Sequence, residues 1–367
     1  MHAIVANGFA EGPAEALRDY LVAHGADVVT IFHPLTREHG SRHVVTSYGG
    51  GEMRARRSVD ARLRPPASYA VDPFVPLLPP RIDAWFGFNP LACGRGLLLR
   101  RLGRTRRAFL WSVDFVPDRF GAGTLSTRIY DRVDRGCCVS ADARIELSQA
   151  ARDGRDRRHG LDAATRAPVR VVPMGAWLAR VPKTSPAAFA ARRVVFLGHL
   201  VPRQGVELLL DAVELLPDVT VDVAGSGPLE SALRARAGAH VRFHGFVPDH
   251  RDVERLLAGA AVGVAPYRPD AESFTRYADP GKLKAYLAAG LPVVLTDVPP
   301  NARELAREAG AEIVPFDATA LARAIEAALA RRQEWEARRS AALAYVSRFD
   351  WEVLLEDLVR DLELRVP

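Results

Sequence analysis

From residue 193 onward, short apolar runs typical of β-strands alternate with helical segments, and this alternation restricts the fold more than any other feature. Helical patterns such as Gly205–Leu216 and Thr319–Ala330 lie between or after the strands. Strands that alternate with helices favour a parallel sheet covered on both faces, which predicts a doubly wound α/β domain. The predicted strands are Val194–Leu197, Val219–Ala224, Val241–His244, Ala261–Ala265, Val293–Thr296 and Glu312–Val314.

The first half of the chain shows the same alternation in a less regular form. Strand Ala3–Ala6, helix Pro13–His24 and strand Asp27–Phe32 make a βαβ opening. The arginine- and proline-rich segment Arg54–Pro80 has little periodicity and is predicted to be a long loop. Together these patterns predict a second parallel sheet wrapped by helices. Its further strands are predicted at Ala84–Phe88, Ala108–Val113, Cys137–Ser140 and Val169–Val172.

The pattern breaks around Ala179–Arg193, where we expect the boundary between two domains. The first domain is predicted to span residues 1–178 and the second residues 190–347. Residues 348–367 are expected to form a helix that packs back on the first domain. Two facing Rossmann-like domains leave a cleft between the carboxyl ends of their strands, where ligands of this architecture bind.

The composition indicates a chain that folds in a reducing compartment. Of three cysteines, Cys137 and Cys138 are adjacent, which suits neither a disulfide framework nor zinc knuckles. The N-terminus lacks the pattern of a signal peptide. The longest apolar runs, such as Ala285–Leu295, are well below the ~18 residues of a membrane span. We therefore expect a cytoplasmic protein.

Positive charge is concentrated in the first half. Residues 1–170 contain 26 arginines, no lysine and 18 acidic residues, which gives +8, whereas the remainder has 24 basic and 26 acidic residues, or −2. The surplus either reflects the coding bias of a GC-rich genome or attracts an anionic partner such as a membrane or an acidic substrate. No nucleic-acid motif accompanies the arginines, so a nucleic acid is not expected as a partner.

Four loops of the second domain follow strands, and the first three are rich in glycine. Glycine lets backbone N–H groups approach an anion closely, and a helix that begins just afterwards directs its positive end to the same place. Each loop alone is also explained by a tight turn between a strand and a helix. The four loops are Gly198–Gly205, Gly225–Pro228, His244–Val247 and Tyr267–Phe274.

The segment Asp279–Pro292 carries the strongest local signal. Asp279 as N-cap, Pro280 at the first helical position and Gly290 after the last turn define a helix of about ten residues. Lys282 is one of three lysines in the chain and lies in the first turn, where a cation opposes the helix dipole. This placement indicates an anion such as a phosphate nearby, although Asp279 could serve the helix cap alone.

The motifs of residues 193–363 together resemble the GT-B glycosyltransferases, specifically those of glycosyltransferase family 4. The first half resembles them only in layout. The resemblance is carried by FLGHLVPRQGVELLLDA, VAGSGPLE, VRFHGFVPD, YADPGKLKAYLAAGLPVVLTD and the terminal FDWEVLLEDLVRDL.

The resemblance implies carbohydrate biosynthesis: a sugar moves from a nucleoside diphosphate donor on the second domain to an acceptor held mainly by the first. It also implies retention of anomeric configuration, and the lack of a D-x-D pair fits a mechanism with neither metal nor cofactor. Lys282 and Arg203 would neutralise the diphosphate, which leaves with concentrated negative charge. The expected donor-binding residues are Gly198, His199, Gln204, Gly225, Gly227, His244, Phe246, Val247, Glu272, Ser273, Phe274 and Asp279.

The chain departs from the family pattern at two places. His199 and Gln204 stand where the family usually has an arginine and a lysine, so Arg203 could take over part of the diphosphate contact. The usual pair of glutamates, with seven residues between them, is missing, because Tyr277 and Ala285 occupy those positions. Glu272 or Asp279 could supply a carboxylate from the same loop.

On the acceptor side we expect Gly8, Asn89 and Trp111 to contact the acceptor and Asp114 to align or deprotonate its hydroxyl group. Asp114 could equally cap a loop. The histidines show no convincing spacing for a metal ligand set and are expected to be surface or packing residues. They include His24, His33, His39, His43, His159 and His250.

The segment Arg95–Arg107 mixes leucines with arginines. It could lie on an anionic membrane, or it could be a helix whose Leu97, Leu98, Leu99 and Leu102 are buried in the core. Two other functions stay open for the whole chain. One is a nucleotide-sugar epimerase of the same architecture, and the other is a degenerate GT-B module that binds a sugar nucleotide or a protein without catalysis.

Overall fold

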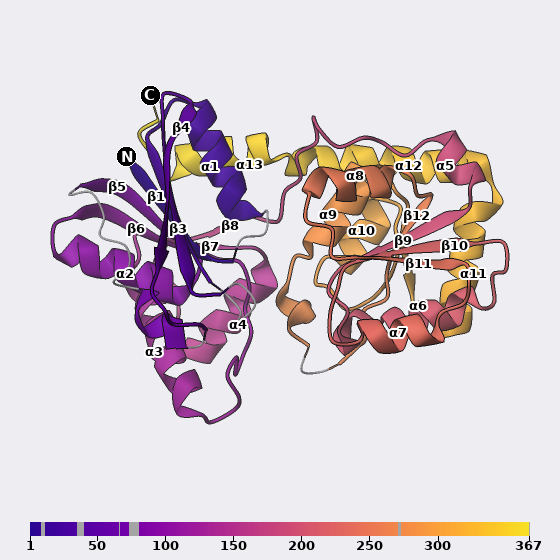
Figure 1. Ribbon diagram of the computed structural model, residues 1–367, viewed down its shortest axis with the longest axis horizontal. Coiled ribbons are helices and arrows are strands. Elements are labelled where there is room, and N and C mark those ends of the chain that lie inside the picture. Colours follow the sequence, from indigo (N-terminus) through magenta and orange to yellow (C-terminus); the bar gives the residue numbers. More distant parts are fainter. Residues whose placement is uncertain (9–11, 35–39, 66, 73–80, 271–272, 367) are drawn as a thin grey trace. The chain divides into compact units, whose positions relative to one another are not determined.

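The computed structural model confirms the α/β class and divides the chain into two compact units. Unit 1 comprises residues 1–173 and 355–367, and unit 2 comprises residues 174–354 (Figure 1). The structure describes residues 1–8, 12–34, 40–65, 67–72, 81–270 and 273–366.

Unit 2 contains the fully parallel sheet that the sequence predicts. Its strand order is β11-β10-β9-β12-β13-β14, and every neighbouring pair is parallel. From the central pair, β9 and β12, the chain adds later strands outward toward each edge of the sheet. This is the arrangement of a Rossmann-like doubly wound domain. The strands are β9 (Arg193–Leu197), β10 (Thr220–Ala224), β11 (Val241–Gly245), β12 (Val262–Ala265), β13 (Val293–Thr296) and β14 (Glu312–Val314).

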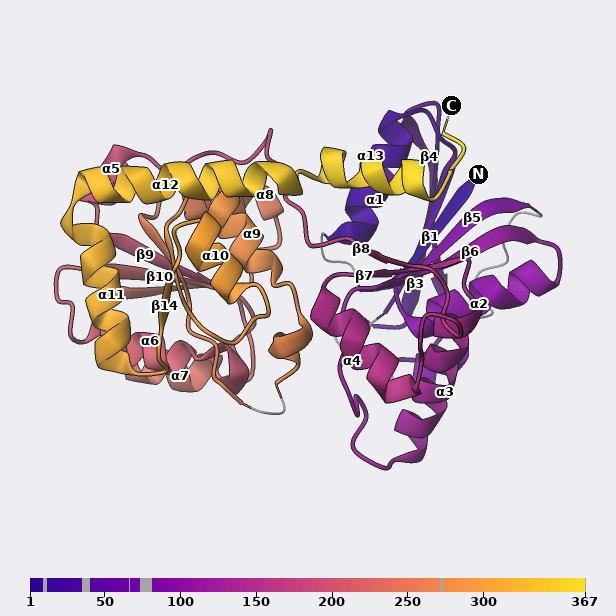
Figure 2. The ribbon, with the colours of Figure 1, turned by 180° about the vertical axis from the view of Figure 1, so that it is seen from behind.

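Helices cover both faces of this sheet because side chains alternate along each strand. Val194 and Phe196 of β9 pack with α6 and α11 on one face, whereas Val195 packs with α8, α9 and α12 on the other (Figure 2). The helices are α5 (Pro186–Ala190), α6 (Val206–Val213), α7 (Glu230–Arg236), α8 (His250–Ala258), α9 (Gly281–Ala288), α10 (Ala302–Glu308), α11 (Ala318–Ala330) and α12 (Arg332–Val346). The 3-10 turns are η4 (Pro202–Gln204), η5 (Phe274–Tyr277) and η6 (Ser347–Phe349).

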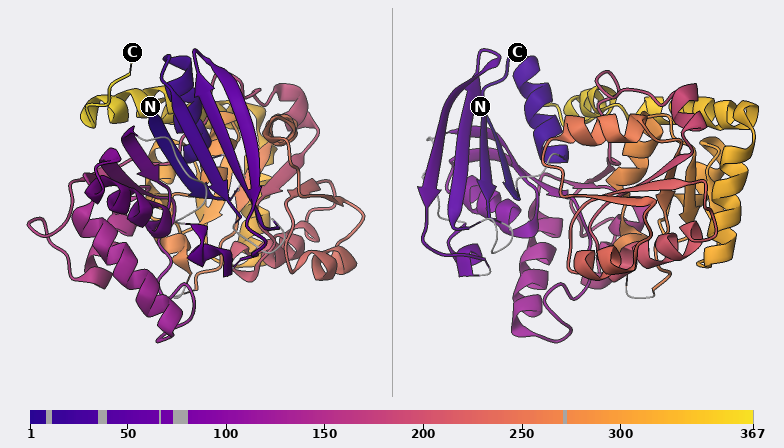
Figure 3. Two further views of the ribbon diagram at one scale, coloured as in Figure 1. Left: turned by 60° about the vertical axis from the view of Figure 1, so that its left-hand side comes forward. Right: turned by 45° about the vertical axis from the view of Figure 1, so that its right-hand side comes forward.

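Unit 1 has an eight-stranded sheet in the order β4-β3-β2-β1-β5-β6-β7-β8. The prediction of a parallel sheet is wrong at one edge, where β3 pairs antiparallel with both β2 and β4 (Figure 3). Residues 54–60 belong to β4, so the predicted loop at Arg54–Pro80 begins with a strand; residues 73–80 lie outside the described residues. The strands are β1 (His2–Asn7), β2 (Val28–His33), β3 (Arg42–Gly49), β4 (Glu52–Asp60), β5 (Ile82–Gly87), β6 (Thr105–Ser112), β7 (Ala143–Glu146) and β8 (Val169–Val171).

The predicted strand Cys137–Ser140 is wrong, because these residues end helix α3. Cys137 and Cys138 are buried against Cys93 and Leu110, and the hydroxyl of Thr124 caps the start of the helix. The missing strand is β7, which begins three residues later. The helical elements are α1 (Pro13–Ala23), α2 (Pro90–Arg101), α3 (Leu125–Ser140), α4 (Gln149–His159) and the 3-10 turn η2 (Ala67–Ala70).

Helix α13 (Trp351–Asp361) begins in unit 2 and ends in unit 1. Arg107 donates hydrogen bonds to the carbonyls of Leu362 and Glu363, and Arg170 pairs with Asp361. These contacts hold the C-terminal residues on unit 1. Among the described residues, no helix combines the length and the apolar character that crossing a membrane requires.

Candidate functional site

Helix α9 begins one residue later than the sequence predicts. Pro280 occupies the N-cap position and Gly281 is the first helical residue, so the expectation of Asp279 as N-cap is wrong. The predicted end of the helix is confirmed, because Gly290 has a φ of +76°, in the left-handed region that favours glycine. Lys282 lies in the first turn, as expected.

The carboxylate of Asp279 is fully engaged within unit 2. Its Oδ1 accepts hydrogen bonds from Lys284 Nζ and from Asn301 Nδ2, each at 2.8 Å. Its Oδ2 accepts from the same Nζ at 2.8 Å and from the backbone N–H of Met174 at 2.7 Å. Asp279 and Lys284 are both buried. The structure thus gives Asp279 a structural ion pair, a partner that sequence reasoning did not identify.

Tyr286 fixes α9 against the carboxyl end of the central strand β9. Its hydroxyl accepts a hydrogen bond of 2.7 Å from the backbone N–H of Leu197 and donates one of 3.2 Å to the carbonyl of Val264. Lys282 lies one turn earlier on the same face of the helix. A Cβ added at Gly198, which has a φ of +147°, would come within 3.0 Å of Lys282 Nζ. The first glycine loop and the lysine therefore meet.

The ammonium group of Lys282 lies in an aromatic setting. Nζ is 4.2 Å from the centroid of the Phe196 ring and 4.8 Å from that of Tyr267, and it donates a hydrogen bond to Gln204 Oε1. Burial lowers the pKa of Lys282 well below its ordinary value, and the Arg203 guanidinium lowers it further. Among the described residues, no carboxylate pairs with this ammonium. Burial of the Lys282 ammonium therefore costs free energy, and a bound anion would offset that cost.

Some residues of the first glycine loop lie beside Lys282, and others point to solvent. Arg203 lies over the Phe274 ring at 4.5 Å, and burial lowers the pKa of its guanidinium. Gln204 accepts the hydrogen bond from Lys282, whereas His199 is exposed. The structure thus brings together Gly198, Arg203, Gln204 and Lys282, four of the residues singled out from the sequence.

Gly225 and Gly227 lie where any side chain would collide with the backbone of the first glycine loop. A Cβ at Gly225 would lie 1.9 Å from the carbonyl oxygen of Gly198, and one at Gly227 would lie 2.5 Å from that of Leu200. Real Cβ atoms do not approach so closely, so both positions require glycine for the backbone of the first loop to pass. They fix the path of the loop that carries Gly198.

The remaining donor candidates are spread over several elements. His244 Nε2 lies 2.7 Å from Asp222 Oδ1, Phe246 is 69% exposed, and Val247 packs against the apolar core beside α9. Ser273 is buried and caps η5 through its hydroxyl, which accepts from the N–H of Thr275. Glu272 lies outside the described residues.

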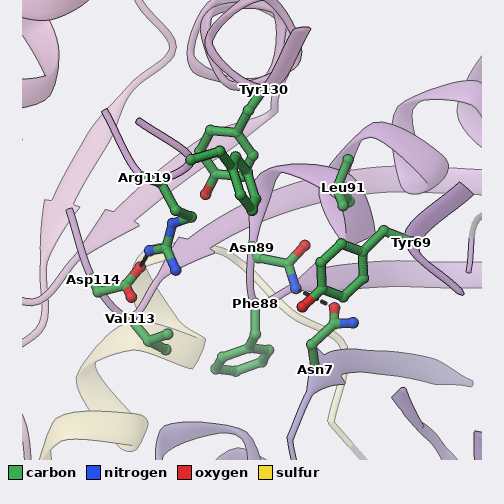
Figure 4. Close-up of a pocket in the computed structure, with 10 residues that line it drawn as sticks. Asn7, Tyr69, Phe88, Asn89, Leu91, Val113, Asp114, Arg119 and Tyr130 are labelled. Atoms are coloured by element: carbon green, nitrogen blue, oxygen red, sulfur yellow. Dashed lines mark hydrogen bonds and ion pairs between the residues drawn. The ribbon is translucent and has the colours of Figure 1, made fainter. Parts of the chain in front are cut away.

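Unit 1 contains a pocket of about 380 Å³ at the carboxyl ends of its strands (Figure 4). Of the acceptor candidates, Asn89 and Asp114 line it, whereas Gly8 and Trp111 are not among its lining residues. Trp111 is fully buried and stacks on Phe88 with ring centroids 5.0 Å apart. The pocket is lined by Asn7, Tyr69, Phe88, Asn89, Leu91, Val113, Asp114, Arg119, Phe120 and Tyr130.

Two polar groups converge on the pocket from different elements. Asn89 caps α2 through Oδ1, which accepts from the N–H of Ala92, and its Nδ2 donates to Asn7 Oδ1 at 2.6 Å. Arg119 forms an ion pair with Asp114 and lies 5.6 Å from the centroid of the Tyr130 ring. Burial lowers the pKa of Arg119, but Asp114 and Tyr130 outweigh that effect and raise it.

The sequence analysis missed Asn7, Arg119 and Tyr130. Asn7 ends the first strand beside Gly8, so its position at a strand end was a usable signal. Arg119 and Tyr130 carry no such signal, because they reach the pocket from a loop and from the middle of α3.

A buried ion network supports the loop that carries Asp114. Arg155 donates to the backbone carbonyl of Asp114 at 2.8 Å and to the hydroxyl of Ser112. Its Nη1 lies 2.5 Å from both oxygens of Asp134, and its Nε is 3.0 Å from Glu146. Because these groups are buried, the geometry of the loop depends on their mutual pairing.

The leucines of the segment Arg95–Arg107 differ in their exposure to solvent. Leu97 and Leu99 pack against the core of unit 1. Leu98 is 46% exposed and Leu102 is 64% exposed, so the expectation that all four leucines are buried is wrong for these two. Arg95 is buried over the Trp85 ring, whereas Arg101 and Arg104 are exposed.

The chain combines two Rossmann-like α/β units, as the GT-B glycosyltransferases do, and comparison with known proteins supports this class. Residues 191–331 match the family model for glycosyl transferases group 1. Sucrose-phosphate synthase from Thermosynechococcus elongatus superimposes with a TM-score of 0.73 at 18% identity, covering 99% of this chain and 98% of that one. The predicted GT-B fold and the resemblance to family 4 are confirmed.

Curated relatives lie among bacterial mannosyltransferases. Phosphatidyl-myo-inositol mannosyltransferase of Mycobacterium leprae is 32% identical over 252 residues, which cover 65% of this chain and 64% of that protein. The protein of the same name from Mycobacterium tuberculosis is 34% identical over 185 residues, 47% of each chain. This chain therefore spans about half to two thirds of the length of these relatives. The Anabaena protein HepE, solved with UDP-glucose, has a TM-score of 0.67 at 17% identity over 99% of this chain and 100% of that one.

Proposed function

We propose that the chain transfers a hexosyl group from a nucleoside diphosphate sugar bound by unit 2 to a hydroxyl group of an acceptor bound by unit 1. The observation that carries this proposal is the cluster at the start of α9. Lys282, Arg203 and the helix N-terminus all present positive charge, and no described carboxylate neutralises Lys282. A diphosphate supplies the missing negative charge. The curated relatives are named as mannosyltransferases, which supports the same chemistry.

The proposed reaction requires no metal ion at the reacting atoms. The bond between the anomeric carbon and the phosphate oxygen breaks, the bond to the acceptor oxygen forms on the same face, and the acceptor proton passes to the leaving phosphate. Negative charge grows on the diphosphate as it leaves, where Lys282 and Arg203 would stabilise it. Asp114 then orients the acceptor hydroxyl and need not remove its proton, which is consistent with its ion pair to Arg119.

The pocket of unit 1 suits a polyhydroxylated acceptor. Phe88, Tyr69 and Tyr130 offer aromatic surfaces, while Asn89 and Asp114 offer groups that bind hydroxyls (Figure 4). Sugars and cyclic polyols combine both requirements, since their C–H faces contact aromatic rings and their hydroxyls need hydrogen-bond partners. The acceptor class we propose is therefore a sugar or a cyclic polyol.

A thermal-shift panel of UDP, GDP and dTDP tests the proposed function. We expect one of them to raise Tm most, because a ligand that binds only the native state stabilises it by about 2.7 kcal/mol at a hundred times its Kd. The matching sugar nucleotide should then release its diphosphate faster when candidate polyols are added. No rise in Tm with any base would refute a donor site. Binding followed by epimerisation alone, or by no turnover at all, would favour the epimerase or the non-catalytic module.

We also propose that unit 1 contacts anionic membranes through α2 and the turn after it. Exposed Leu98 and Leu102 stand beside exposed Arg101 and Arg104, an arrangement that suits a lipid surface. The curated relatives are named for a phosphatidylinositol acceptor, which agrees with an acceptor at a membrane.

We expect the chain to co-sediment with vesicles that contain anionic lipid at low salt and to detach as salt is raised. Replacing Arg101 and Arg104 by glutamate should abolish sedimentation. The control is the same replacement at Arg56 and Arg57, which are exposed on β4 of the same unit and change the net charge equally. Equal loss with both pairs would show a general charge effect, and no pelleting of the parent chain would exclude the membrane contact.

A further inference from the structure

Two histidines that the sequence analysis left as scattered residues lie together in the interior of unit 1. His33 ends β2 and His43 lies near the start of β3, its antiparallel neighbour. Their Nδ1 atoms are 2.7 Å apart, and both side chains are buried. Asp72, which follows η2, directs Oδ1 to the same point, 3.7 Å from Nδ1 of His33 and 3.6 Å from that of His43.

The three converging atoms do not satisfy one another. Oδ1 of Asp72 is buried and has no hydrogen-bond partner among the residues that the structure describes, which carries a free-energy cost for a carboxylate in the interior. A hydrogen bond between two neutral imidazoles uses a single proton and leaves this oxygen unpaired. A cation placed among the three atoms would satisfy all of them.

We propose that His33, His43 and Asp72 bind one divalent transition-metal ion of the zinc type. Zinc binds imidazole nitrogen and carboxylate oxygen at about 2.0–2.2 Å, and tetrahedral ligands at that distance lie roughly 3.3–3.6 Å apart. The separation of 2.7 Å between the two Nδ1 atoms is below this range, and the separations of 3.6 and 3.7 Å to Oδ1 of Asp72 are close to its upper limit, so side-chain movements of less than about 1 Å would complete the geometry. A fourth position is left for water, and nitrogen and oxygen ligands favour zinc over calcium or magnesium.

The surroundings orient the carboxylate of Asp72. Nδ2 of Asn7 donates to Oδ2 of Asp72 at 2.9 Å, which leaves Oδ1 to face the histidines. Arg95 is the nearby cation, and its Nη1 donates to the backbone carbonyl of Asp72 at 3.4 Å.

The position of the site suggests its role. Asn7 also donates to the carbonyl of Pro34 at 3.4 Å and lines the pocket in which we propose the acceptor binds (Figure 4). A bound ion would join β2, β3 and the segment after η2 behind that wall of the pocket. This inference stands apart from the proposed transfer, whose diphosphate site lies in unit 2.

A second group of potential ligands, Asp134, Cys138 and His159, is a natural control. Both oxygens of Asp134 are held by Nη1 of Arg155, and Oδ2 also lies 2.9 Å from His159 Nε2. Its negative charge is already neutralised, so this cluster offers little to a cation. The two clusters also differ chemically, because only the second contains a thiol.

The test uses the full chain, without an affinity tag of histidines, stripped with a chelator and then titrated with Zn²⁺. We expect one tightly bound Zn²⁺ per chain by elemental analysis after gel filtration, and a rise in Tm. His43→Gln and Asp72→Asn should each weaken binding at least 100-fold, because even the loss of an outer partner costs about 10- to 100-fold. His159→Gln should leave Zn²⁺ binding unchanged. Lys282→Met, which removes the ammonium of the proposed diphosphate site, should leave it unchanged as well.

The Co²⁺ form decides the question even if the variants fail to fold. Four-coordinate Co²⁺ with nitrogen and oxygen ligands shows intense visible bands without the thiolate charge-transfer band that Cys138 would add. Bands of the first kind at one equivalent support the proposal. No stoichiometric metal, a thiolate band, or binding unaffected by both His43→Gln and Asp72→Asn would overturn it.

Discussion

A Lys282→Met variant should bind the preferred nucleoside diphosphate about 100-fold more weakly than the parent chain and melt at the same temperature or higher. The loss of affinity follows from removing a buried charge that pairs with a phosphate, a change worth about 2–5 kcal/mol. Release of the diphosphate from the sugar nucleotide should slow by about 10²- to 10³-fold, the usual cost of removing one group that stabilises developing charge.

The expected stability of this variant follows from the sign of the pKa shift. Burial and Arg203 lower the pKa of Lys282, so the folded chain holds that proton less tightly than the unfolded chain does. Below the ordinary pKa of lysine, this shift therefore opposes folding, and methionine removes this cost while keeping a side chain of similar length. A site that is less stable with its own charge than without it is typical of a binding site.

A bound anion favours the charged lysine and should raise its pKa, so proton uptake on diphosphate binding is expected at any pH where the free protein holds Lys282 partly neutral. Titration calorimetry in two buffers of different ionisation enthalpy measures this uptake, which should be absent in Lys282→Met. Lys183→Met is the matched control in the same unit, because Lys183 donates to the carbonyl of Leu178, away from the first glycine loop. Asp114→Asn, in unit 1, should also leave diphosphate affinity unchanged. Unaltered affinity in Lys282→Met, or equal loss with Lys183→Met, would refute the assignment.

An Asp279→Asn variant should lose about 3–5 kcal/mol of unfolding free energy, the largest loss of stability that we expect from one substitution in unit 2. The reason is that Lys284, which is 1% exposed, would keep its charge in the interior without the carboxylate that neutralises it. The contact with the Phe349 ring, 4.3 Å from Nζ, offsets only part of that loss. Urea unfolding monitored by tryptophan fluorescence measures the change.

The double variant Asp279→Asn with Lys284→Met separates charge pairing from other causes. Because replacing both members of a buried ion pair is often neutral, most of the lost stability should return. Diphosphate affinity of the folded protein should stay within a few-fold of the parent value. If Asp279→Asn instead kept full stability and lost affinity, Asp279 would be a donor ligand, the role that the sequence first suggested.

The sequence predicted unit 2 well because its four inner strands, β9, β10, β12 and β13, are largely buried and appear as short apolar runs. Val194, Val195 and Phe196 are all fully buried, so no polar residue interrupts the pattern. The hairpin of β3 and β4 was missed for the opposite reason. Strand β4 is exposed along nearly its whole length and carries Arg54, Arg56 and Arg57, a composition that suits an edge strand but also suits a loop.

The candidate sites could be predicted only where one short segment contains the whole signal. Lys282 was found because its position in a capped helix is unfavourable on its own. The pocket of unit 1 was predicted in part, since Asn89 and Asp114 follow strands, but Arg119 and Tyr130 reach it through tertiary packing. The pairing of His33 with His43 likewise depends on the antiparallel register of β2 and β3, which the sequence does not reveal.

The most direct test of the account is a crystal structure of the full chain with the nucleoside diphosphate that raises Tm most. We predict a phosphate oxygen at about 2.7–3.2 Å from Lys282 Nζ, beside Gly198 and the first N–H groups of α9, with Gln204 displaced from the ammonium or sharing it. A diphosphate bound elsewhere in the chain, while Lys282 keeps its hydrogen bond to Gln204 and no anion reaches it, would contradict the assignment.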